Sequence, residues 1–230
     1  MALKRTSRTR KRELEQPDRF ETALNKIIQF ILEHKVRVFI GLGIIVGLCF
    51  IVAGMQYFAY RSENKAFSLL GQGMNQYRSV IQQSGPEKAY RDVAKDFQQI
   101  IQKYSGNHGG KLAMFVFGNI CYQAGSYDQA IELYQQSLIN FEGFPFFKNL
   151  TLSGLAYSYE AKKDYDTAAR FFEMIVSTPD AGFKDEALFN LAEIYAILGN
   201  RDQRSNAFKK IISDHPDSIY LEIAKEKVAG

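Results

Sequence analysis

AGSYDQAIELYQQSL (residues 124–138) and KKDYDTAARFFEMIV (residues 162–176) carry the same order of side chains. In each stretch a turn-forming run precedes a tyrosine, an alanine follows three residues later, and an aromatic residue comes four residues after the alanine. This spacing places the three side chains on one face of an α-helix. Each stretch is therefore predicted to be a turn followed by a helix with one apolar face.

The pattern continues upstream of both turns and recurs a third time, which predicts a series of helical hairpins. A small residue marks the middle of each first helix, at Gly118, Ala156 and Ala192. The third unit is the weakest, because Arg204 stands where the first two have alanine. The spacing of the second helix also occurs one unit earlier, so residues 62–104 are expected to supply an irregular opening unit.

One hairpin cannot bury its apolar face alone, so neighbouring hairpins are expected to stack into a solenoid. The pattern resembles the tetratricopeptide repeat over residues 87–216, with units longer than the usual length of about 34 residues. The extra residues are placed in the loops between units, GFPFF at residues 143–147 among them. Residues 218–229 are predicted to form a capping helix. The expected fold class is all-α, with a tetratricopeptide-like helical-hairpin solenoid in residues 61–230.

Residues 38–60, VFIGLGIIVGLCFIVAGMQYFAY, form a run without a charge that is bracketed by Arg37 and Arg61. As a helix the run is roughly 34 Å long, enough to cross a hydrocarbon layer of about 30 Å. Tyr57 and Tyr60 near its end suit the lipid headgroup layer. A buried helix of a soluble core rarely runs this long without a polar face. A single N-terminal transmembrane helix in contact with membrane lipid is therefore predicted at residues 38–60.

A cleaved signal peptide and a lipoprotein signal are two other interpretations of this run. A signal peptide usually has an apolar region of about 7–15 residues before a small-residue cleavage site. Here the run is longer and continues from Gly54 into aromatic residues. A lipoprotein signal ends at its cysteine, whereas Cys49 lies in the middle of the run. The segment is therefore expected to remain as an uncleaved anchor.

The distribution of charge predicts the orientation of the chain. Residues 1–37 hold ten Lys or Arg against five Asp or Glu, whereas the chain after Tyr60 is nearly neutral. Lys and Arg next to a span stay on the cytoplasmic side. We therefore expect a bacterial inner-membrane protein with a cytoplasmic N-terminus and a periplasmic domain at residues 61–230. The start KRTSRTRKR also looks like a nucleic-acid patch, but topology and attraction to anionic lipid explain it more simply, so no nucleic-acid partner is expected.

The basic cytoplasmic tail, residues 1–37, has two parts. Residues 1–18 are polar and are expected to lack regular structure. Residues 19–33 have helical spacing, which predicts either an amphipathic helix on the cytoplasmic membrane face or an extension of the spanning helix. Beyond the span, the first strong helix breaker is SGP at residues 84–86, so the membrane helix is expected to continue directly into the outer domain.

The sequence offers no candidate catalytic residues. The three histidines, His34, His108 and His215, are scattered, and no metal-binding, phosphate-binding or nucleophile motif occurs. GNHGG at residues 106–110 is rich in glycine but lacks a lysine and a preceding strand, so it is expected to be an inter-helix loop. We therefore expect a protein that is not an enzyme and has no metal, cofactor or small-molecule substrate.

Binding to other proteins remains as the expected activity. In tetratricopeptide repeats the first helices line a concave groove, and the resemblance transfers that register to this chain. The implied groove residues are Leu112, Phe115, Asn119, Tyr122, Leu150, Ser153, Tyr157, Glu160, Glu186, Phe189, Glu193 and Ala196. This face is aromatic and lacks the Lys and Asn clamp by which some family members hold a C-terminal carboxylate; only Asn119 matches one element. Such a face suits extended or helical apolar segments, and packing between repeats is an equally expected role for any single ring.

The loop around residues 143–147 is a second candidate surface, because it contains four phenylalanines close together. These are Phe141, Phe144, Phe146 and Phe147. Burial under the neighbouring repeat is the preferred interpretation of this cluster.

The whole layout resembles the ancillary subunit of the bacterial Sec translocon, a family with a basic tail, one uncleaved span and a periplasmic tetratricopeptide domain. The resemblance implies a scaffold or co-chaperone that assists translocation or folding of secreted proteins. Its implied partners are translocon subunits and a membrane-anchored periplasmic chaperone. The ending DHPDSIYLEIAKEK, residues 214–227, also resembles repeats of envelope-assembly proteins, which usually carry a cleaved signal. An adaptor for peptidoglycan or outer-membrane machinery is therefore the alternative.

Overall fold

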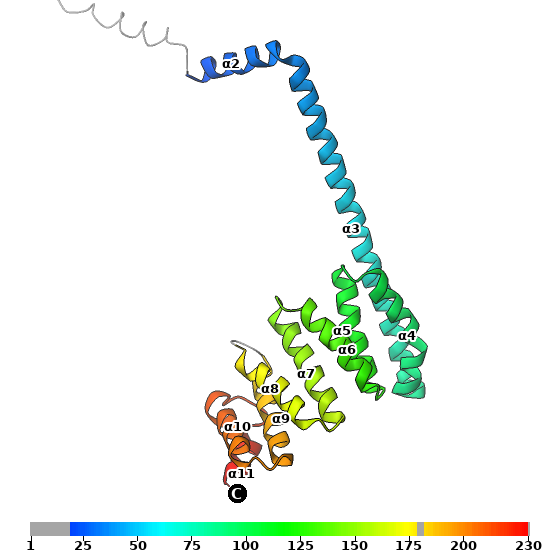
Figure 1. Ribbon diagram of the computed structural model, residues 1–230, viewed down its shortest axis with the longest axis vertical. Coiled ribbons are helices and arrows are strands. Elements are labelled where there is room, and N and C mark those ends of the chain that lie inside the picture. Colours follow the sequence, from blue (N-terminus) through cyan, green and yellow to red (C-terminus); the bar gives the residue numbers. More distant parts are fainter. Residues whose placement is uncertain (1–18, 179–181, 230) are drawn as a thin grey trace, which may run out of the picture. The chain divides into compact units, whose positions relative to one another are not determined.

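The computed structural model describes residues 19–178 and 182–229, and these residues form helices and turns without a strand (Figure 1). The polar start predicted at residues 1–18 lies outside the described residues. The helices are α2 (Arg19–Glu33), α3 (Lys35–Ser84), α4 (Pro86–Lys103), α5 (His108–Gln123), α6 (Tyr127–Asn140), α7 (Pro145–Ala161), α8 (Tyr165–Ser177), α9 (Lys184–Ile197), α10 (Arg201–Asp214) and α11 (Leu221–Ala229). The all-helical prediction is confirmed over the described part of the chain.

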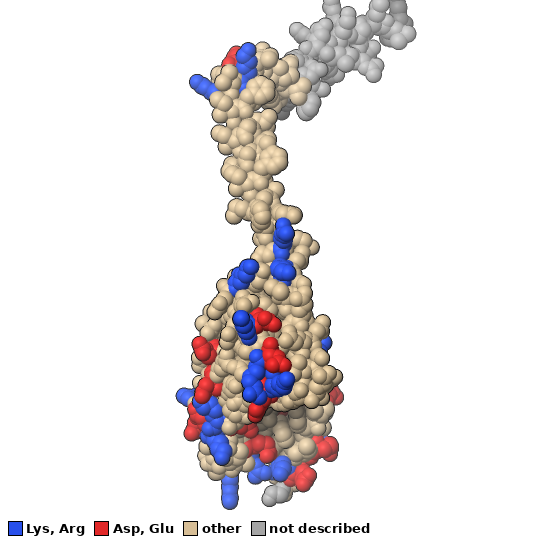
Figure 2. Space-filling view, turned by 90° about the vertical axis from the view of Figure 1, so that its right-hand side faces the viewer, with Lys and Arg blue, Asp and Glu red and all other residues tan. Residues whose placement is uncertain are grey.

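The chain divides into two compact units, residues 1–59 and residues 60–230. In the first unit, the apolar side chains of the uncharged run are exposed, including Phe39 and Phe50. Figure 2 shows this stretch as a surface without Lys, Arg, Asp or Glu. By length and composition, α3 is able to cross a membrane, and no residue of its most apolar window is buried.

The helix α3 has no break between the uncharged run and Ser84, where the predicted breaker ends it. Within the second unit its last turns bury Ala66, Leu70 and Tyr77. The helix α2 covers the residues predicted to be helical, and only His34 separates it from α3. Exposed Leu24, with Ile27, Ile28 and Ile31, recurs at helical spacing along α2.

The second unit is a row of hairpins in which each helix packs on the next (Figure 1). The hairpins are α5–α6, α7–α8 and α9–α10, which confirms the three predicted units. The end of α3 and α4 make the opening unit. The capping helix α11 packs on α10 and begins at Leu221, three residues later than predicted. Ser218 lies in the turn before α11, where its hydroxyl accepts a hydrogen bond from the Tyr220 N–H at 3.1 Å.

The same turn closes all three hairpins. Its left-handed residue is Gly125, Lys163 or Gly199, with φ of 77°, 64° and 76°. The amide after each of these residues donates to a carbonyl five residues earlier, at 2.9, 2.9 and 2.8 Å. This is the Schellman arrangement that satisfies the last carbonyls of a helix. Lys163 adopts the left-handed conformation at a cost of about 1 kcal/mol, which the glycines avoid.

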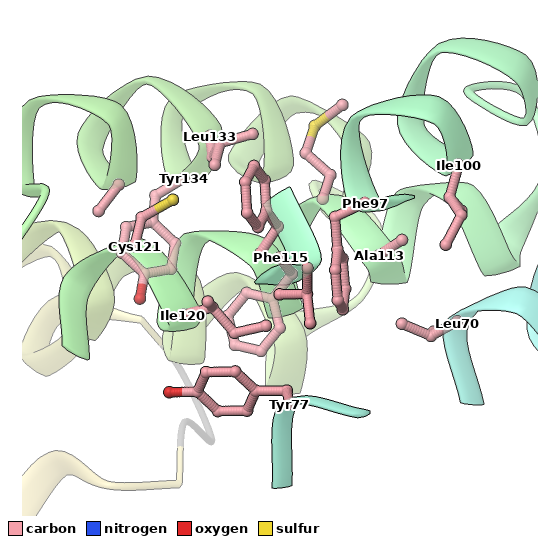
Figure 3. Packing of buried hydrophobic residues seen from close by; sticks show 14 of the residues in the cluster. Leu70, Tyr77, Phe97, Ile100, Ala113, Phe115, Ile120, Cys121, Leu133 and Tyr134 are labelled. Atoms are coloured by element: carbon pink, nitrogen blue, oxygen red, sulfur yellow. The ribbon is translucent and has the colours of Figure 1, made fainter. Parts of the chain in front are cut away.

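The core follows the small and aromatic positions of the repeat (Figure 3). Phe97 and Phe117 stack at 5.4 Å between ring centroids, and Gly73 of α3 makes room for the Phe97 ring. Tyr134 lies between two helices that each present a glycine, since a Cβ at Gly118 or Gly154 would meet its ring at 2.9 or 2.6 Å. The repeat therefore needs small residues where a ring enters from the neighbouring helix.

The glycine-rich run at residues 106–110 differs from its prediction as an inter-helix loop. His108, Gly109 and Gly110 form the first turn of α5. A Cβ at Gly109 would lie 2.8 Å from the Cβ of Ala66, and a Cβ at Gly110 only 1.9 Å from the Tyr104 carbonyl oxygen. These glycines are required by close packing at the start of a helix, and the turn between α4 and α5 is confined to residues 104–107.

Candidate partner-binding groove

A cavity of about 390 Å³ opens between α5, α7 and the start of α9. Its lining residues come from the first helices of successive hairpins, from α6 and from the loop before α9. They are Phe115, Asn119, Tyr122, Tyr134, Leu150, Ser153, Gly154, Tyr157, Phe183 and Glu186. We call this lining the groove. Its volume lies within the range of about 300–1,000 Å³ that is typical of ligand pockets.

Tyr134 forms the polar centre of the groove floor. Its ring is buried, and its hydroxyl donates a hydrogen bond to Oδ1 of Asn119 at 2.6 Å. Burial raises the pKa of Tyr134, so the hydroxyl stays protonated and keeps donating. The Asn119 side chain is thereby held in place by the second helix of its own hairpin.

The wall on the α9 side is a hydrogen-bonded bridge between two successive hairpins. The Tyr157 hydroxyl donates to Oε1 of Glu186 at 2.7 Å and accepts from Nδ2 of Asn190 at 2.8 Å. Burial, followed by the contact with Glu186, raises the pKa of Tyr157. The Tyr157 ring packs edge-on against Phe172, at 5.3 Å between centroids. These contacts fix the Glu186 carboxylate at the edge of the groove.

The opposite end of the groove contains Tyr122 and, close to it, Glu160. Tyr122 packs on Tyr127, with 5.6 Å between ring centroids. Burial raises the pKa of Tyr122, and the nearby Tyr127 and Glu160 raise it further. Burial also raises the pKa of Glu160, which is half-buried on α7. The groove therefore has a carboxylate near each end.

Seven of the twelve predicted groove residues line the same cavity: Phe115, Asn119, Tyr122, Leu150, Ser153, Tyr157 and Glu186. Whether the cavity binds a partner stays a prediction.

The other predicted residues lie outside the lining. Glu160 is beside one end, Glu193 is exposed on α9, and Leu112 packs partly against the core. Phe189 stacks on Tyr220 at 4.5 Å and so packs between the last hairpin and its cap. Phe115 is only 9% exposed, which makes it part of the floor and of the core at once.

Tyr134, Gly154 and Phe183 were not predicted as groove residues. Tyr134 fits the packing pattern of the second helix, and its spacing does not reveal that its hydroxyl reaches the groove. Gly154 provides the space for that ring. Phe183 precedes α9 with a left-handed φ of 68°, and no helical spacing marks it.

The phenylalanine cluster divides into a buried part and an exposed part. Phe141 and Phe147 stack at 4.9 Å between centroids, and Phe141 is buried as predicted. Phe144 and Phe146 are 52% and 58% exposed, so the prediction of burial is wrong for them. Phe146 packs on Phe183 at 5.7 Å, which joins this loop to the groove. Phe146 and Phe147 are consecutive residues in the first turn of α7, so their side chains leave the helix in different directions.

Models of the tetratricopeptide repeat match three stretches of the sequence, residues 115–140, 151–181 and 185–213. The solenoid is tetratricopeptide-like. These stretches coincide with the three hairpins that build the groove. Tetratricopeptide repeats imply a scaffold for protein–protein interaction, and such proteins are generally not enzymes. Among the described residues, no group of three or more His, Cys, Asp or Glu side chains could hold a metal ion.

Solved structures support this fold. A tetratricopeptide repeat protein from Parabacteroides merdae is similar with a TM-score of 0.54 and 15% identity; the match covers 70% of this chain and 59% of that one. A Podosopora anserina putative kinesin light chain with TPR-like repeats is similar with a TM-score of 0.54 and 13% identity. That match covers 70% of this chain and 83% of the other. BtubC (BKLC) from P. vanneervenii is similar with a TM-score of 0.53 and 13% identity, and the match covers 77% of each chain. No curated protein matches the sequence.

Proposed function

We propose that this protein is a single-pass inner-membrane scaffold whose tetratricopeptide-like solenoid holds partner proteins at the periplasmic face of a bacterial membrane. In this role it assists the translocation or folding of secreted proteins, as a co-chaperone. The proposed partners are subunits of the Sec translocon, a periplasmic chaperone or the emerging chains themselves.

The exposed apolar run in α3 is the observation that carries the proposal. Residues 38–60 present no polar face and bury no side chain, so in water they would expose a long apolar surface. A bilayer would surround this apolar surface with lipid and so remove the free-energy cost of exposing it to water. A cleaved signal sequence would pass the same test of length and composition, but here one helix continues from the apolar run into residues that pack in the solenoid core.

Topology is the first test of this proposal. Alkaline phosphatase fused after the last residue, Gly230, should be active in a Gram-negative host, because the enzyme needs the periplasm to fold. The same enzyme fused after Arg37, before the span, should be inactive and serves as the control. The fusion should also keep the mass of the uncleaved chain. A Gly230 fusion that is made at full length but is inactive would contradict the proposed orientation.

The partner is tested by photocrosslinking in intact cells from half-exposed groove positions, Tyr122, Leu150 and Ser153. Lys209 and Glu132, exposed on second helices, are the matched control positions. Adducts with translocon subunits, a periplasmic chaperone or secreted chains are expected from the groove and not from the controls. Adducts from the exposed Phe144 and Phe146 alone would contradict the groove as the binding surface.

An envelope-assembly adaptor is the second candidate function. The residues after α10, in DHPDSIYLEIAKEK, form the cap that packs on the last hairpin, which is the segment whose sequence suggests this class. Groove adducts confined to peptidoglycan-synthesis or outer-membrane-assembly proteins would favour it over the translocation role.

A further inference from the structure

We infer that the groove takes an extended polypeptide segment in which a large apolar side chain is flanked by lysine or arginine. This inference rests on the proposed function in one respect, namely that the groove is the surface on which a partner protein binds. It adds the chemistry of the bound segment.

The floor of the groove selects an apolar side chain. Phe115, Leu150 and the Tyr134 ring line it, and the Tyr134 hydroxyl already donates to Asn119. A polar side chain entering this space would lose water and gain few new hydrogen bonds, whereas an apolar one would gain from burial.

The charge of the groove selects cations beside that apolar side chain. Glu186 lines the cavity and Glu160 lies near its other end, while no Lys or Arg is among the lining residues. Lys148 and Lys184 lie in the first turns of α7 and α9 but do not line the cavity. In the part of the chain that the structure describes, neither carboxylate forms an ion pair.

The environment of Glu160 supports this step. Burial raises the pKa of its carboxyl, because the charged form is incompletely hydrated and no cation compensates it. A lysine or arginine from a bound segment would supply that compensation. The Glu186 carboxylate accepts from the Tyr157 hydroxyl at Oε1 and forms no ion pair among the described residues, so a cation of the bound segment can pair with it.

The same geometry disfavours a C-terminal carboxylate as the bound group. Such a group would face Glu160 and Glu186 without a positive residue in the lining. Asn119 could offer such a group only its neutral amide nitrogen, because its oxygen accepts from Tyr134.

The rim indicates a bound segment longer than one residue. Phe183 lines the cavity and contacts Phe146, and the adjacent Phe144 is exposed as well. The apolar surface thus continues from the cavity onto the α6–α7 loop. An extended chain laid along this path would place alternate side chains on the aromatic surface.

The inference is tested with three fluorescent peptides and the full chain in phosphatidylcholine nanodiscs. The peptides are GSKFLKFSG, GSQFLQFSG and GSEFLEFSG, which share their apolar residues and differ in charge. Empty nanodiscs measure binding to lipid alone, and anisotropy reports binding to the protein. The lysine peptide is expected to bind about tenfold more tightly than the glutamine peptide, because each of two partly exposed ion pairs should raise the affinity about threefold. The glutamate peptide is expected to bind most weakly.

Two variants identify the source of the preference. Glu160→Gln combined with Glu186→Gln should reduce the affinity for the lysine peptide about tenfold and leave the glutamine peptide unchanged. Glu132→Gln combined with Glu226→Gln, both exposed and away from the groove, should change neither. Equal affinity for the lysine and glutamate peptides, equal effects of the two double variants, or no binding of any peptide would overturn the inference. Groove crosslinks in cells without a lysine preference would leave the scaffold role standing and refute only the cationic segment.

Discussion

Replacing Gly110 with alanine is expected to lower the free energy of unfolding of the solenoid by about 3 kcal/mol, at the upper end of typical overpacking effects. The new Cβ would lie 1.9 Å from the Tyr104 carbonyl oxygen and 2.5 Å from its carbonyl carbon. Backbone atoms cannot rotate away as a flexible side chain would. Either the first turn of α5 or the end of α4 must therefore move, although alanine itself favours a helix.

Urea unfolding of the full chain in detergent micelles, followed by circular dichroism, measures this effect as a shift in midpoint. Gly106→Ala is the matched control, because a Cβ there meets no atom within 4 Å. Gly109→Ala is expected to fall between the two, since its Cβ would approach Ala66 at 2.8 Å and the Phe67 amide nitrogen at 2.9 Å. Equal midpoints for the Gly106 and Gly110 variants would refute the packing role.

The hairpins were predictable because their signal is local. An alanine and an aromatic residue four positions apart define a helix face, and a glycine seven positions after the small residue marks the turn. The turn at Lys163 shows that position can outweigh residue type, because this lysine takes the left-handed conformation that glycine has in the other two hairpins. The sequence could not predict the role of Gly109 and Gly110, which depends on how closely α3 and Tyr104 approach them.

The groove was predictable in part, for the same reason. The register of the first helices groups Asn119, Tyr122 and Tyr157, and these three residues line one cavity. The register also assigns Phe189 to the groove, but this ring lies outside the cavity lining and stacks on Tyr220 of the cap. That contact depends on tertiary packing between segments distant in the sequence. The register omits Phe183, whose position depends on a left-handed residue in a loop. Contacts that join distant segments leave no periodic trace in the sequence.

Removing the Glu63 carboxylate is expected to destabilise the solenoid by about 2 kcal/mol at neutral pH, the range for losing a helix cap. Asn107, at the N-cap of α5, makes no capping hydrogen bond with its own side chain. Glu63 of α3 replaces it, accepting from the Gly109 N–H at 2.7 Å, the His108 N–H at 3.1 Å and Nδ2 of Asn107 at 3.2 Å. A negative charge at a helix N-terminus also interacts favourably with the helix dipole.

Glu63→Ala should lose all three hydrogen bonds and leave the amide of buried Gly109 without an acceptor, which adds a desolvation cost. Glu63→Gln keeps an acceptor oxygen but loses the charge, so a smaller loss of about 1 kcal/mol is expected. Glu132→Gln, on the exposed face of α6, is the control and should not change the urea midpoint.

The pH dependence separates the charge of Glu63 from its packing. Burial acts to raise the pKa of Glu63, but the hydrogen bonds from Gly109, His108 and Asn107 outweigh it and hold the pKa below the ordinary value of 4.5. Because the folded-state pKa is the lower one, the unfolded chain binds the proton more readily. The stabilisation is therefore complete above about pH 4.5 and is lost as the pH falls through the folded-state pKa. The gap in urea midpoint between wild type and Glu63→Gln should accordingly narrow from pH 7 to pH 3. A gap that stays constant over this range would mean that the side chain acts through its shape and not through its charge.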